Sequence, residues 1–419
     1  MIALLAATGA NVFVDRHGGT IGNQIRSASM GLRRELSSRK WHTHPMNFRI
    51  LVLGGYGNFG AHISRRLAAW DDVDLIIGGR DGLRAANFAA NLPGSASRRG
   101  VAIDLSDPRF ADQLAQIAAD LVIHTAGPFQ GQDYRVAQTA VGAGAHYVDL
   151  ADGRAFVTGF ADAVDATARA ADRLAVTGAS SVPGLSAVVL DALRREFAQI
   201  DRVEIGISPG NRSERGLATV RAILGYIGRP YRVWRNGGWH ETRGWSTLQR
   251  HRYGDPIGTR WLSDCDVPDH DLFPARYDIR DRLDFFAGLE LRSLHLGLWL
   301  GAAMRRVGLV RDWSRYAKPM FAIAERLKNL GNDAGAMHVD VLGRDLSDRP
   351  IHTRWTVLAR DGSGPEIPCT AAVMIADRLR QGRLAIRGAR PCLDLFTLDE
   401  FMVELAPWPI DAWRDTIID

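Results

Sequence analysis

Cysteine is scarce in this sequence. Among 419 residues only Cys265, Cys369 and Cys392 occur, and no two of them form a Cys-x-x-Cys pair. Disulfide-stapled secreted domains and structural zinc sites both need more cysteines at closer spacing. The histidines are scattered as well, and His42 and His44 are the only close pair. We therefore expect a cytoplasmic protein without a bound metal.

Lysine is almost absent. Lys40, Lys318 and Lys328 are the only three among 52 basic residues, so the net charge of +5 is carried almost wholly by arginine. No basic run is long enough to track a nucleic acid. The charge is better explained by phosphorylated cofactors and solubility, and no nucleic-acid partner is expected.

Long hydrophobic runs are also missing. The apolar segment Leu294–Met304 has eleven residues and ends in Arg305 and Arg306, whereas about 20 residues are needed to span a bilayer. We expect no transmembrane span. A buried helix or a homodimer contact is the favoured interpretation of this segment, and peripheral membrane contact is the alternative.

A short apolar strand leads into a glycine-rich turn and then into a helical pattern. Ile50–Leu53 are four consecutive apolar residues, typical of a strand in a parallel sheet. Gly55, Gly57 and Gly60 follow. In a dinucleotide site the first glycine permits the tight turn, the second admits the pyrophosphate and the third lets helix and strand pack closely. The order predicts a dinucleotide site rather than a glycine turn without a ligand.

The end of the second predicted strand, Val73–Ile77, decides between the two nicotinamide cofactors. An acidic residue there would bind the ribose 2′-hydroxyl of NAD, whereas an arginine can bind a 2′-phosphate. Arg80 stands at this place, and its bidentate, permanently charged guanidinium suits phosphate. Asp81 would favour NAD after a shift of one residue. We predict NADP, with NAD as the alternative.

Strands and helices continue to alternate. Further strands are predicted at residues 101–104, 121–125, 146–150 and 174–177. This rhythm predicts an α/β fold with a Rossmann-type, doubly wound, mostly parallel sheet. Ligands of such sheets bind beyond the carboxyl ends of the strands. The loops at residues 127–129, 149–154 and 180–183 should therefore lie around the cofactor.

Four of these segments carry a family resemblance: Gly54–Gly60, Thr125–Phe129, His146–Gly153 and Ser180–Leu185. They resemble, in the same order, the saccharopine dehydrogenase (reductase) superfamily in its broad oxidoreductase branch. The resemblance covers residues 46–200 and implies a nicotinamide-binding Rossmann domain followed by a mixed α/β domain. Beyond residue 200 the chain departs from the lysine-pathway enzymes, so the resemblance does not identify the substrate.

The resemblance also implies cofactor contacts. The pyrophosphate would be held by Gly55, Gly57, Asn58, Phe59 and Gly60. The other implied contacts are Arg80 at the 2′-phosphate, Asp104 near the adenine, and Gly127, Pro128 and Phe129 beside the nicotinamide.

Four regions are predicted along the chain. Residues 1–45 lie outside the strand–helix pattern and are interpreted as a disordered leader or a mis-assigned start. Residues 46–199 form the nucleotide-binding domain. From residue 200 onward nine of the eleven tryptophans appear and the alternation ends, and residues 200–392 are interpreted as an α+β substrate or dimerisation domain. Residues 393–419 are a tail that packs on the body.

A lysine base can be excluded. The Tyr-x-x-x-Lys pair of short-chain dehydrogenases is missing, because Leu36, Ser314 and Ala324 stand four residues before the three lysines. No lysine lies between residues 41 and 317, so none is available in the nucleotide-binding domain.

Five polar residues near the expected cofactor are candidates for the chemistry. Asp149 or Asp152 would relay the proton that accompanies hydride transfer, and Arg154 would hold an acidic substrate. Asp152 is equally suited to cap the helix that follows. His124 fits a buried core position as well as a site. Ser180 would donate a hydrogen bond to cofactor or substrate, or cap the next helix.

Together these observations predict an NADP-dependent oxidoreductase. It would transfer a hydride between nicotinamide and a small or lipid-like carbonyl, imine or enoyl compound. The alternative is an NADP-binding protein without turnover, acting as a redox sensor or a membrane-surface partner.

Overall fold

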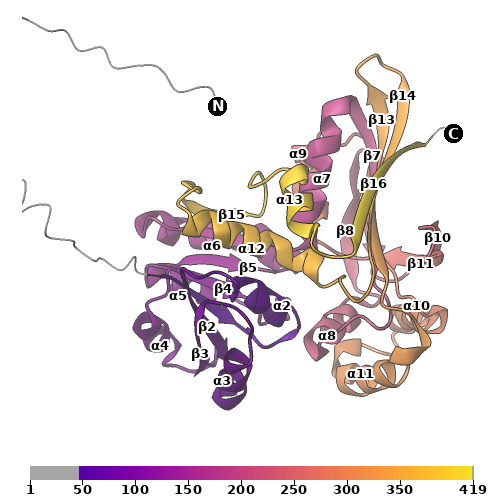
Figure 1. Ribbon diagram of the computed structural model, residues 1–419. Helices are drawn as coiled ribbons and strands as arrows, with labels where there is room; N and C mark the ends of the chain where they lie inside the picture. Colours follow the sequence, from indigo (N-terminus) through magenta and orange to yellow (C-terminus); the bar gives the residue numbers. More distant parts are fainter. Residues whose placement is uncertain (1–46, 418–419) are drawn as a thin grey trace, which may run out of the picture. The chain divides into compact units, whose positions relative to one another are not determined.

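The computed structural model describes residues 47–417, and the chain from Asn47 onward forms one compact unit. The predicted leader, residues 1–45, and the pair His42 and His44 lie outside the described residues. Within the described part, two sheets carry the fold (Figure 1).

The first sheet has seven strands in the order β15-β6-β5-β4-β1-β2-β3, and every pairing in it is parallel. The predicted doubly wound sheet of Rossmann type is confirmed. Its strands are β1 (Phe48–Leu53), β2 (Val73–Gly79), β3 (Ser97–Ala102), β4 (Leu121–His124), β5 (His146–Asp149), β6 (Leu174–Thr177) and β15 (Gly388–Pro391).

The apolar run of β1 explains why this sheet is covered on both faces. Ile50 and Val52 belong to one core cluster, whereas Leu51 and Leu53 belong to another. Successive side chains of a strand point to opposite faces, so an uninterrupted apolar run requires helices on both sides. The helices are α2 (Asn58–Leu67), α3 (Gly82–Ala90), α4 (Phe110–Ile117), α5 (Arg135–Gly142), α6 (Arg154–Ala170) and α12 (Glu366–Arg380).

The predicted third strand is misplaced. It was expected at residues 101–104, but β3 spans Ser97–Ala102, so Asp104 lies in the loop beyond its end. The segment Ser97–Gly100 is largely polar, and a polar edge strand gives no apolar pattern to read.

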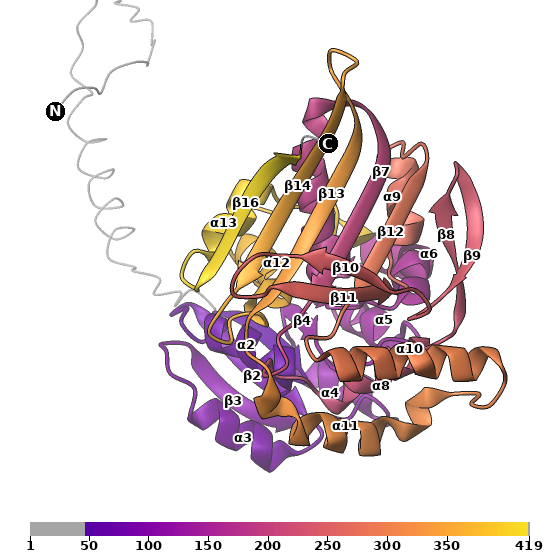
Figure 2. The ribbon, with the colours of Figure 1, turned by 90° about the vertical axis from the view of Figure 1, so that its right-hand side faces the viewer.

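The second sheet has nine strands (Figure 2). Seven follow the order β10-β11-β12-β7-β13-β14-β16, and the hairpin β8–β9 is attached through β12. Strands β12 and β7 pair in parallel. Its strands are β7 (Phe197–Ser208), β8 (Pro230–Arg235), β9 (Gly238–Arg243), β10 (Gln249–Arg252), β11 (Thr259–Asp264), β12 (Arg282–Ala287), β13 (Gly335–Asp345), β14 (Pro350–Ala359) and β16 (Ile410–Ile417). The predicted hairpin turn at Asn236-Gly237 is present, and both residues have positive φ, as a two-residue hairpin turn requires.

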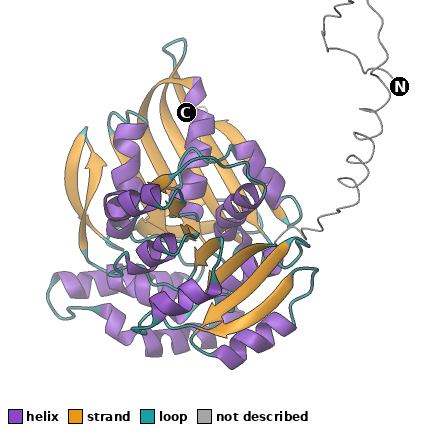
Figure 3. Cartoon of the chain, turned by 90° about the vertical axis from the view of Figure 1, so that its left-hand side faces the viewer, coloured by secondary structure: helices purple, strands orange, loops and turns teal. Residues whose placement is uncertain are grey.

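Three helices cover one face of the second sheet (Figures 1 and 3). They are α7 (Ser186–Leu193), α9 (Asp269–Arg276) and α13 (Leu398–Leu405). Their apolar residues join the same core cluster as alternate residues of β7, β13 and β14.

A separate helical group lies at the end of the second sheet near β10 and β11 (Figure 2). It consists of α8 (Leu217–Tyr226), α10 (Arg292–Arg306), α11 (Ala317–Arg326) and the short helix η3 (Trp313–Tyr316). Leu224, Leu298, Ala302 and Ala317 form its core with Trp245. Among the described residues, no helix is long and apolar enough to cross a bilayer.

The chain returns to the first sheet near its end. β15 pairs with β6, and α12 packs against α2. β16 instead pairs with β14 in the second sheet. Both sheets therefore include strands from beyond residue 360. The predicted domain boundaries at residues 200 and 393 stay predictions.

Candidate cofactor and substrate site

The turn between β1 and α2 is built around Gly54 rather than Gly55. Gly54 has φ +79°, in the left-handed region, whereas Gly55 does not have positive φ. The prediction that Gly55 provides the tight turn is wrong in this detail. Gly55 serves close packing, because a Cβ there would lie 2.9 Å from the carbonyl oxygen of Val52.

Gly57 and Gly60 have the roles that a dinucleotide site requires. Gly57 is the N-cap of α2 and provides no side-chain cap, and the first turn of the helix contains no acidic residue. The N–H groups at this helix end are therefore free for an anion. A Cβ on Gly60 would lie 2.1 Å from the carbonyl oxygen of Gly54 and 2.7 Å from Thr125 Oγ1. Only glycine lets α2 approach the β1 and β4 loops this closely.

The side chains of Asn58 and Phe59 point to protein neighbours. Asn58 Nδ2 donates to the carbonyl oxygen of Glu214 at 3.3 Å, and Phe59 packs on the main core cluster. What these residues can offer a pyrophosphate is their backbone N–H groups. Their predicted role stays a prediction.

Arg80 is exposed just beyond β2 and is accompanied by a second arginine. Arg84 lies one turn into α3, with its guanidinium carbon 4.9 Å from the centre of the Tyr56 ring. Asp81 caps α3 by accepting from Arg84 N at 2.9 Å, and its own N–H donates to Tyr56 Oη at 3.1 Å. Asp81, the carboxylate that would favour NAD, is thus engaged through one oxygen in capping α3, and the contact of Arg80 with a 2′-phosphate stays a prediction.

Asp104 lies in the loop after β3. Its Oδ1 accepts from the N–H and the hydroxyl of Ser106, and these hydrogen bonds hold the pKa of the Asp104 carboxyl below its usual value. The positive charge of Arg80 acts in the same direction. Asp104 therefore lies close to Arg80, which agrees with a place at the adenosine end of a cofactor.

The loop after β4 is held in a fixed shape. Gln132 Nε2 donates to the carbonyl oxygens of Ala126 and Pro128, at 3.0 and 2.8 Å. Phe129 is 4% exposed and packs edge-on against His124. The buried ring of Phe129 supports the loop from behind, so backbone and Pro128 are the groups available to a nicotinamide.

Asp149 is fully buried at the end of β5. Its Oδ1 accepts from Ala151 N, Thr177 Oγ1 and Gly178 N at 2.8–2.9 Å. Burial raises the pKa of this carboxyl to about 6, although these hydrogen bonds oppose the rise. Its Oδ2 has no hydrogen-bond partner within the described residues. Asp149 ties the ends of β5 and β6 together.

Nearby, His124 is also buried, and its Nδ1 lies 2.9 Å from Tyr147 Oη. Burial lowers the pKa of His124 to about 4, so the imidazole is neutral. The structure places His124 in the core.

Asp152 does not cap α6. The N-cap is Gly153, and Asp152 Oδ1 accepts from Gln130 Nε2 at 3.0 Å. The alternative prediction of a capping role is therefore wrong. Solvent reaches Asp152, but the surrounding protein displaces part of its hydration and raises the pKa of its carboxyl group.

Arg154 joins the two sheets. Its guanidinium pairs with Asp266 at 3.0 Å and with Asp271, and it donates to the carbonyl oxygen of Arg232 at 2.6 Å. The side chain is 10% exposed. These partners occupy the donors that a substrate carboxylate would need.

Ser180 follows β6 and precedes the irregular turn that leads into α7. Neither Ser180 nor a neighbouring serine caps that turn or α7 through its side chain. The capping alternative is wrong, and contact between Ser180 and the cofactor stays a prediction, as do the catalytic roles of Asp149, Asp152 and Arg154.

A cavity of about 350 Å³ opens beside the loop after β4. Pro128 and Gln130 line it from the first sheet. The opposite wall comes from the helical group and contains Arg221, Tyr226, Arg229, Arg305, Asp312 and Ser314. Its volume is within the range of about 300–1,000 Å³ that ligand pockets have.

Three arginines give this cavity a positive wall. Arg305 donates to the carbonyl oxygens of Gly225 and Ile227. Arg221 and Arg229 are exposed, and within residues 47–417 no ion pair is found for either. These two side chains are free to bind an anion.

Tyr226 provides a protonated group at the same cavity. Tyr226 lines the cavity together with Gln130, and Gln130 Nε2 donates to Asp152 at 3.0 Å. Burial raises the pKa of Tyr226 above its usual value, and the charge of Asp152 adds to the rise. The phenol therefore keeps its proton at neutral pH.

Apart from Pro128, sequence reasoning missed the cavity residues, and it assigned no cofactor role to Gly54, Tyr56 or Arg84. Gly54 and Tyr56 lie within the glycine-rich segment itself, and Arg84 stands four residues after Arg80, on the helix that follows. The cavity arginines come from separate elements, so their spacing in the sequence carries no signal.

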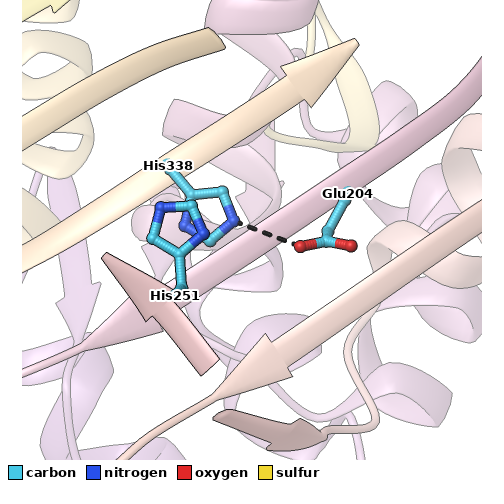
Figure 4. Close-up of side chains that lie close together, drawn as sticks. All are labelled: Glu204, His251 and His338. Atoms are coloured by element: carbon cyan, nitrogen blue, oxygen red, sulfur yellow. Dashed lines mark ion pairs between the residues drawn. The ribbon is translucent and has the colours of Figure 1, made fainter. Parts of the chain in front are cut away.

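A second cluster of polar residues lies on the second sheet (Figure 4). Ligand-type atoms of Glu204, His251 and His338 lie within 4.8 Å of one another. The two imidazole rings are stacked, with centres 3.6 Å apart and planes 7° apart. The in-plane lone pairs of stacked rings run parallel and do not converge on one ion. The prediction that no metal is bound stays a prediction.

Comparison with known proteins was made for the sequence and the fold. Residues 50–177 match the family described as the saccharopine dehydrogenase NADP binding domain. No curated protein gives a significant sequence match. The fold is similar to apo saccharopine dehydrogenase (L-Glu forming) from Saccharomyces cerevisiae, with a TM-score of 0.61 at 14% identity over 88% of this chain and 100% of that one.

DAP dehydrogenase of C. glutamicum in complex with DAP covers 85% of this chain and 99% of its own, at 15% identity and a TM-score of 0.42. The likeness to the yeast protein shows the fold, with a parallel nucleotide-binding sheet and a second mixed sheet. The family match confirms the predicted saccharopine dehydrogenase-like resemblance and the predicted cofactor NADP, whereas the residues that contact the cofactor stay predictions.

Proposed function

We propose that this chain, whose residues 50–177 match the saccharopine dehydrogenase NADP binding domain, is a nicotinamide-dependent oxidoreductase whose substrate is a small carbonyl, imine or enoyl compound that carries an anionic group. The observation that supports the substrate class is the cavity between Pro128 and the helical group, with Arg221 and Arg229 in its wall.

The position of the cavity supports hydride transfer. In a parallel sheet the cofactor lies across the carboxyl ends of the strands, at the point where the strand order reverses. Here that point is between β1 and β4. The loop after β4 would border the nicotinamide, and this loop also lines the cavity. A substrate in the cavity would therefore lie against the reacting end of the cofactor.

NADP, when bound, supplies or accepts the hydride. The residues of this chain fit it: free N–H groups at the start of α2 for the pyrophosphate, and Arg80 and Arg84 for the 2′-phosphate. Gly60 lets α2 begin close to Gly54 and Thr125.

Tyr226 is the proposed proton donor. Its phenol is protonated at neutral pH and lines the cavity, and the negative charge of Asp152 acts on it. Asp152, a carboxyl group that solvent reaches, is the proposed second acid–base group of the site. In this proposal Asp149 ties β5 to β6, and Arg154 joins the two sheets.

The proposal is tested by following NADPH oxidation over matched pairs of carbonyl and imine compounds with and without a carboxylate or phosphate group. We expect turnover to require the anionic group. The variant Arg221→Ala/Arg229→Ala should raise KM for such a substrate by about 10²-fold, since two charge-assisted hydrogen bonds are lost. The control Arg195→Ala, an exposed arginine in another region, should leave KM unchanged.

Equal turnover of the paired compounds would refute the anionic substrate. Stoichiometric NADPH binding with no oxidation over the whole panel would refute the enzyme and favour the non-catalytic sensor. The three cysteines are free thiols, which is consistent with a reducing compartment. We propose that the protein is cytoplasmic.

A further inference from the structure

The segment that contains α10, α11 and the turns beside them holds more than half of the exposed large hydrophobic residues of the described chain. Of the large hydrophobic residues that are exposed, eight of fourteen lie between residues 296 and 330. We refer to them as the helical patch: Leu296, Trp299, Leu300, Val307, Leu309, Tyr316, Ile323 and Leu330.

The outer face of α10 lacks the polar residues that an exposed helix normally has. From Ser293 to Met304 there is no charged residue. Leu298 and Ala302 pack into the core of the helical group, but Leu300 is 54% exposed on another face of the same helix. A surface helix usually turns its polar face outward. Here both faces are apolar, so the outer one lacks a partner within the described residues.

Basic residues surround the helical patch. Residues 292–330 contain eight basic and two acidic side chains, a net charge of +6, although the whole chain carries only +5. Arg306, Arg311 and Lys318 are exposed there, and no ion pair is found for them among the described residues. The surface is therefore both apolar and strongly cationic.

We propose that the helical patch binds a membrane surface that contains anionic phospholipids, with α10 and α11 lying in the plane of the headgroups. Apolar side chains would enter the acyl boundary, and the arginines and lysines would contact lipid phosphates. Trp299 suits this depth, because its indole is apolar in body and polar at Nε1, where it donates to the carbonyl oxygen of Ser246.

The positive charge of the helical patch argues against two other binding partners, a second copy of the chain and residues 1–46. A second copy of the chain would place one patch of +6 against another, and like charges across an interface are repulsive. Residues 1–46 contain six basic and two acidic side chains, so this segment is cationic as well. An anionic lipid surface is complementary to the patch in both respects.

This inference goes beyond the proposed reaction and does not depend on it. The two are close in space, since Arg305 on α10 also lines the cavity. Binding of the patch to a membrane would hold the mouth of the cavity near the lipid headgroups.

Vesicle sedimentation with the full chain tests the proposal. Vesicles of phosphatidylcholine alone are compared with vesicles that contain phosphatidylserine. We expect binding to the anionic vesicles, at least tenfold weaker binding to the neutral ones, and weakening at high salt. Absence of binding to anionic vesicles would overturn the proposal.

Matched variants distinguish vesicle binding through the helical patch from nonspecific hydrophobic adsorption. Leu296→Gln/Leu300→Gln/Val307→Gln should reduce anionic-vesicle binding more than tenfold. The control Leu83→Gln/Leu346→Gln/Val403→Gln removes three apolar residues elsewhere that are even more exposed, and it should bind as the wild type does. NADPH binding by each variant verifies its fold. An equal loss in both variants would overturn the proposal, as would a patch variant that abolishes a dimer and leaves vesicle binding unchanged.

Charge reversal gives an independent readout. Arg306→Glu/Arg311→Glu/Lys318→Glu should remove the preference for anionic over neutral vesicles. Arg99→Glu/Arg195→Glu, at exposed positions outside the patch, should keep it. Preference that survives the first substitution would show that the basic residues of the patch do not contact lipid.

Discussion

Replacing Arg80 should change the choice of cofactor without changing the fold. Arg80 is exposed beyond the end of β2, where the ribose of the adenosine lies in a nucleotide-binding sheet. Asp81 is engaged in capping α3, so no free carboxylate takes its place for NAD. In Arg80→Ala we therefore expect the affinity for NADPH to fall and the affinity for NADH to stay the same.

The magnitude follows from the contacts available. A hydrogen bond between charged groups contributes about 1.5–3 kcal/mol. Because Arg80 is open to solvent, the lower half of this range applies, about 2 kcal/mol, which is roughly a 30-fold loss of NADPH affinity. Arg84 remains nearby with its guanidinium over Tyr56. Some NADPH preference should therefore remain in Arg80→Ala and disappear in Arg80→Ala/Arg84→Ala.

Isothermal titration of both cofactors measures these changes directly. Arg99→Ala, an exposed arginine on β3, serves as the control and should bind like the wild type. Equal affinity of the wild type for NADPH and NADH would refute the role of Arg80, as would a variant in which both affinities fall together.

Three further predictions concern the groups around the site. Arg154→Ala should lower the free energy of unfolding by about 3 kcal/mol in denaturant titration, because it leaves two partly buried carboxylates without their partner; Arg109→Ala, at an exposed pair, should cause no measurable change. The Asp149 carboxyl has a pKa of about 6 in the folded protein, against an ordinary value of 3.8. Its tighter proton binding in the folded state stabilises the fold at low pH, and this stabilisation is lost as the pH rises through 6. The stability of Asp149→Asn relative to the wild type should therefore grow by up to about 3 kcal/mol between pH 4 and pH 7, and a difference independent of pH would contradict the buried carboxyl. Tyr226→Phe should lower kcat by about 10²-fold with unchanged NADPH affinity, whereas Tyr316→Phe should leave both unchanged; equal rates in the two variants would exclude Tyr226 as the proton donor.

The nucleotide-binding sheet could be predicted because its signals are local. The apolar run Ile50–Leu53 requires a covered parallel strand, and Gly57 and Gly60 stand at fixed distances from its end. Such patterns depend on neighbours within a few residues, so one sequence suffices to read them.

Other features could not be read in the same way. The close packing of Gly54 against Thr125, and of Gly55 against Val52 and Ile77, depends on how the strands pack together. The first residues of β3 are largely polar and show no alternation of apolar side chains, so the start of this strand could not be predicted. Asp152 was expected either to relay protons or to cap α6, and only the position of Gln130 decides against the cap.

The cavity wall is the part that sequence reasoning could not reach. Arg221, Arg229 and Arg305 are brought together by the packing of α8 against α10, and nothing in their spacing indicates it. The sequence shows that Leu294–Met304 is apolar. It does not show which of these residues pack against Leu224 and Trp245 and which stay exposed.

NADPH binding at the turn between β1 and α2 is tested most directly by NADPH titration of the wild type beside Gly60→Ala. The added Cβ would lie 2.1 Å from the carbonyl oxygen of Gly54, so the turn must shift away from the position that admits a pyrophosphate. We expect saturable one-to-one binding by the wild type and a loss of at least tenfold in the variant, with Gly142→Ala, where a Cβ meets open space, as the control. Absence of NADPH binding by the wild type, or equal binding by Gly60→Ala, would contradict the account.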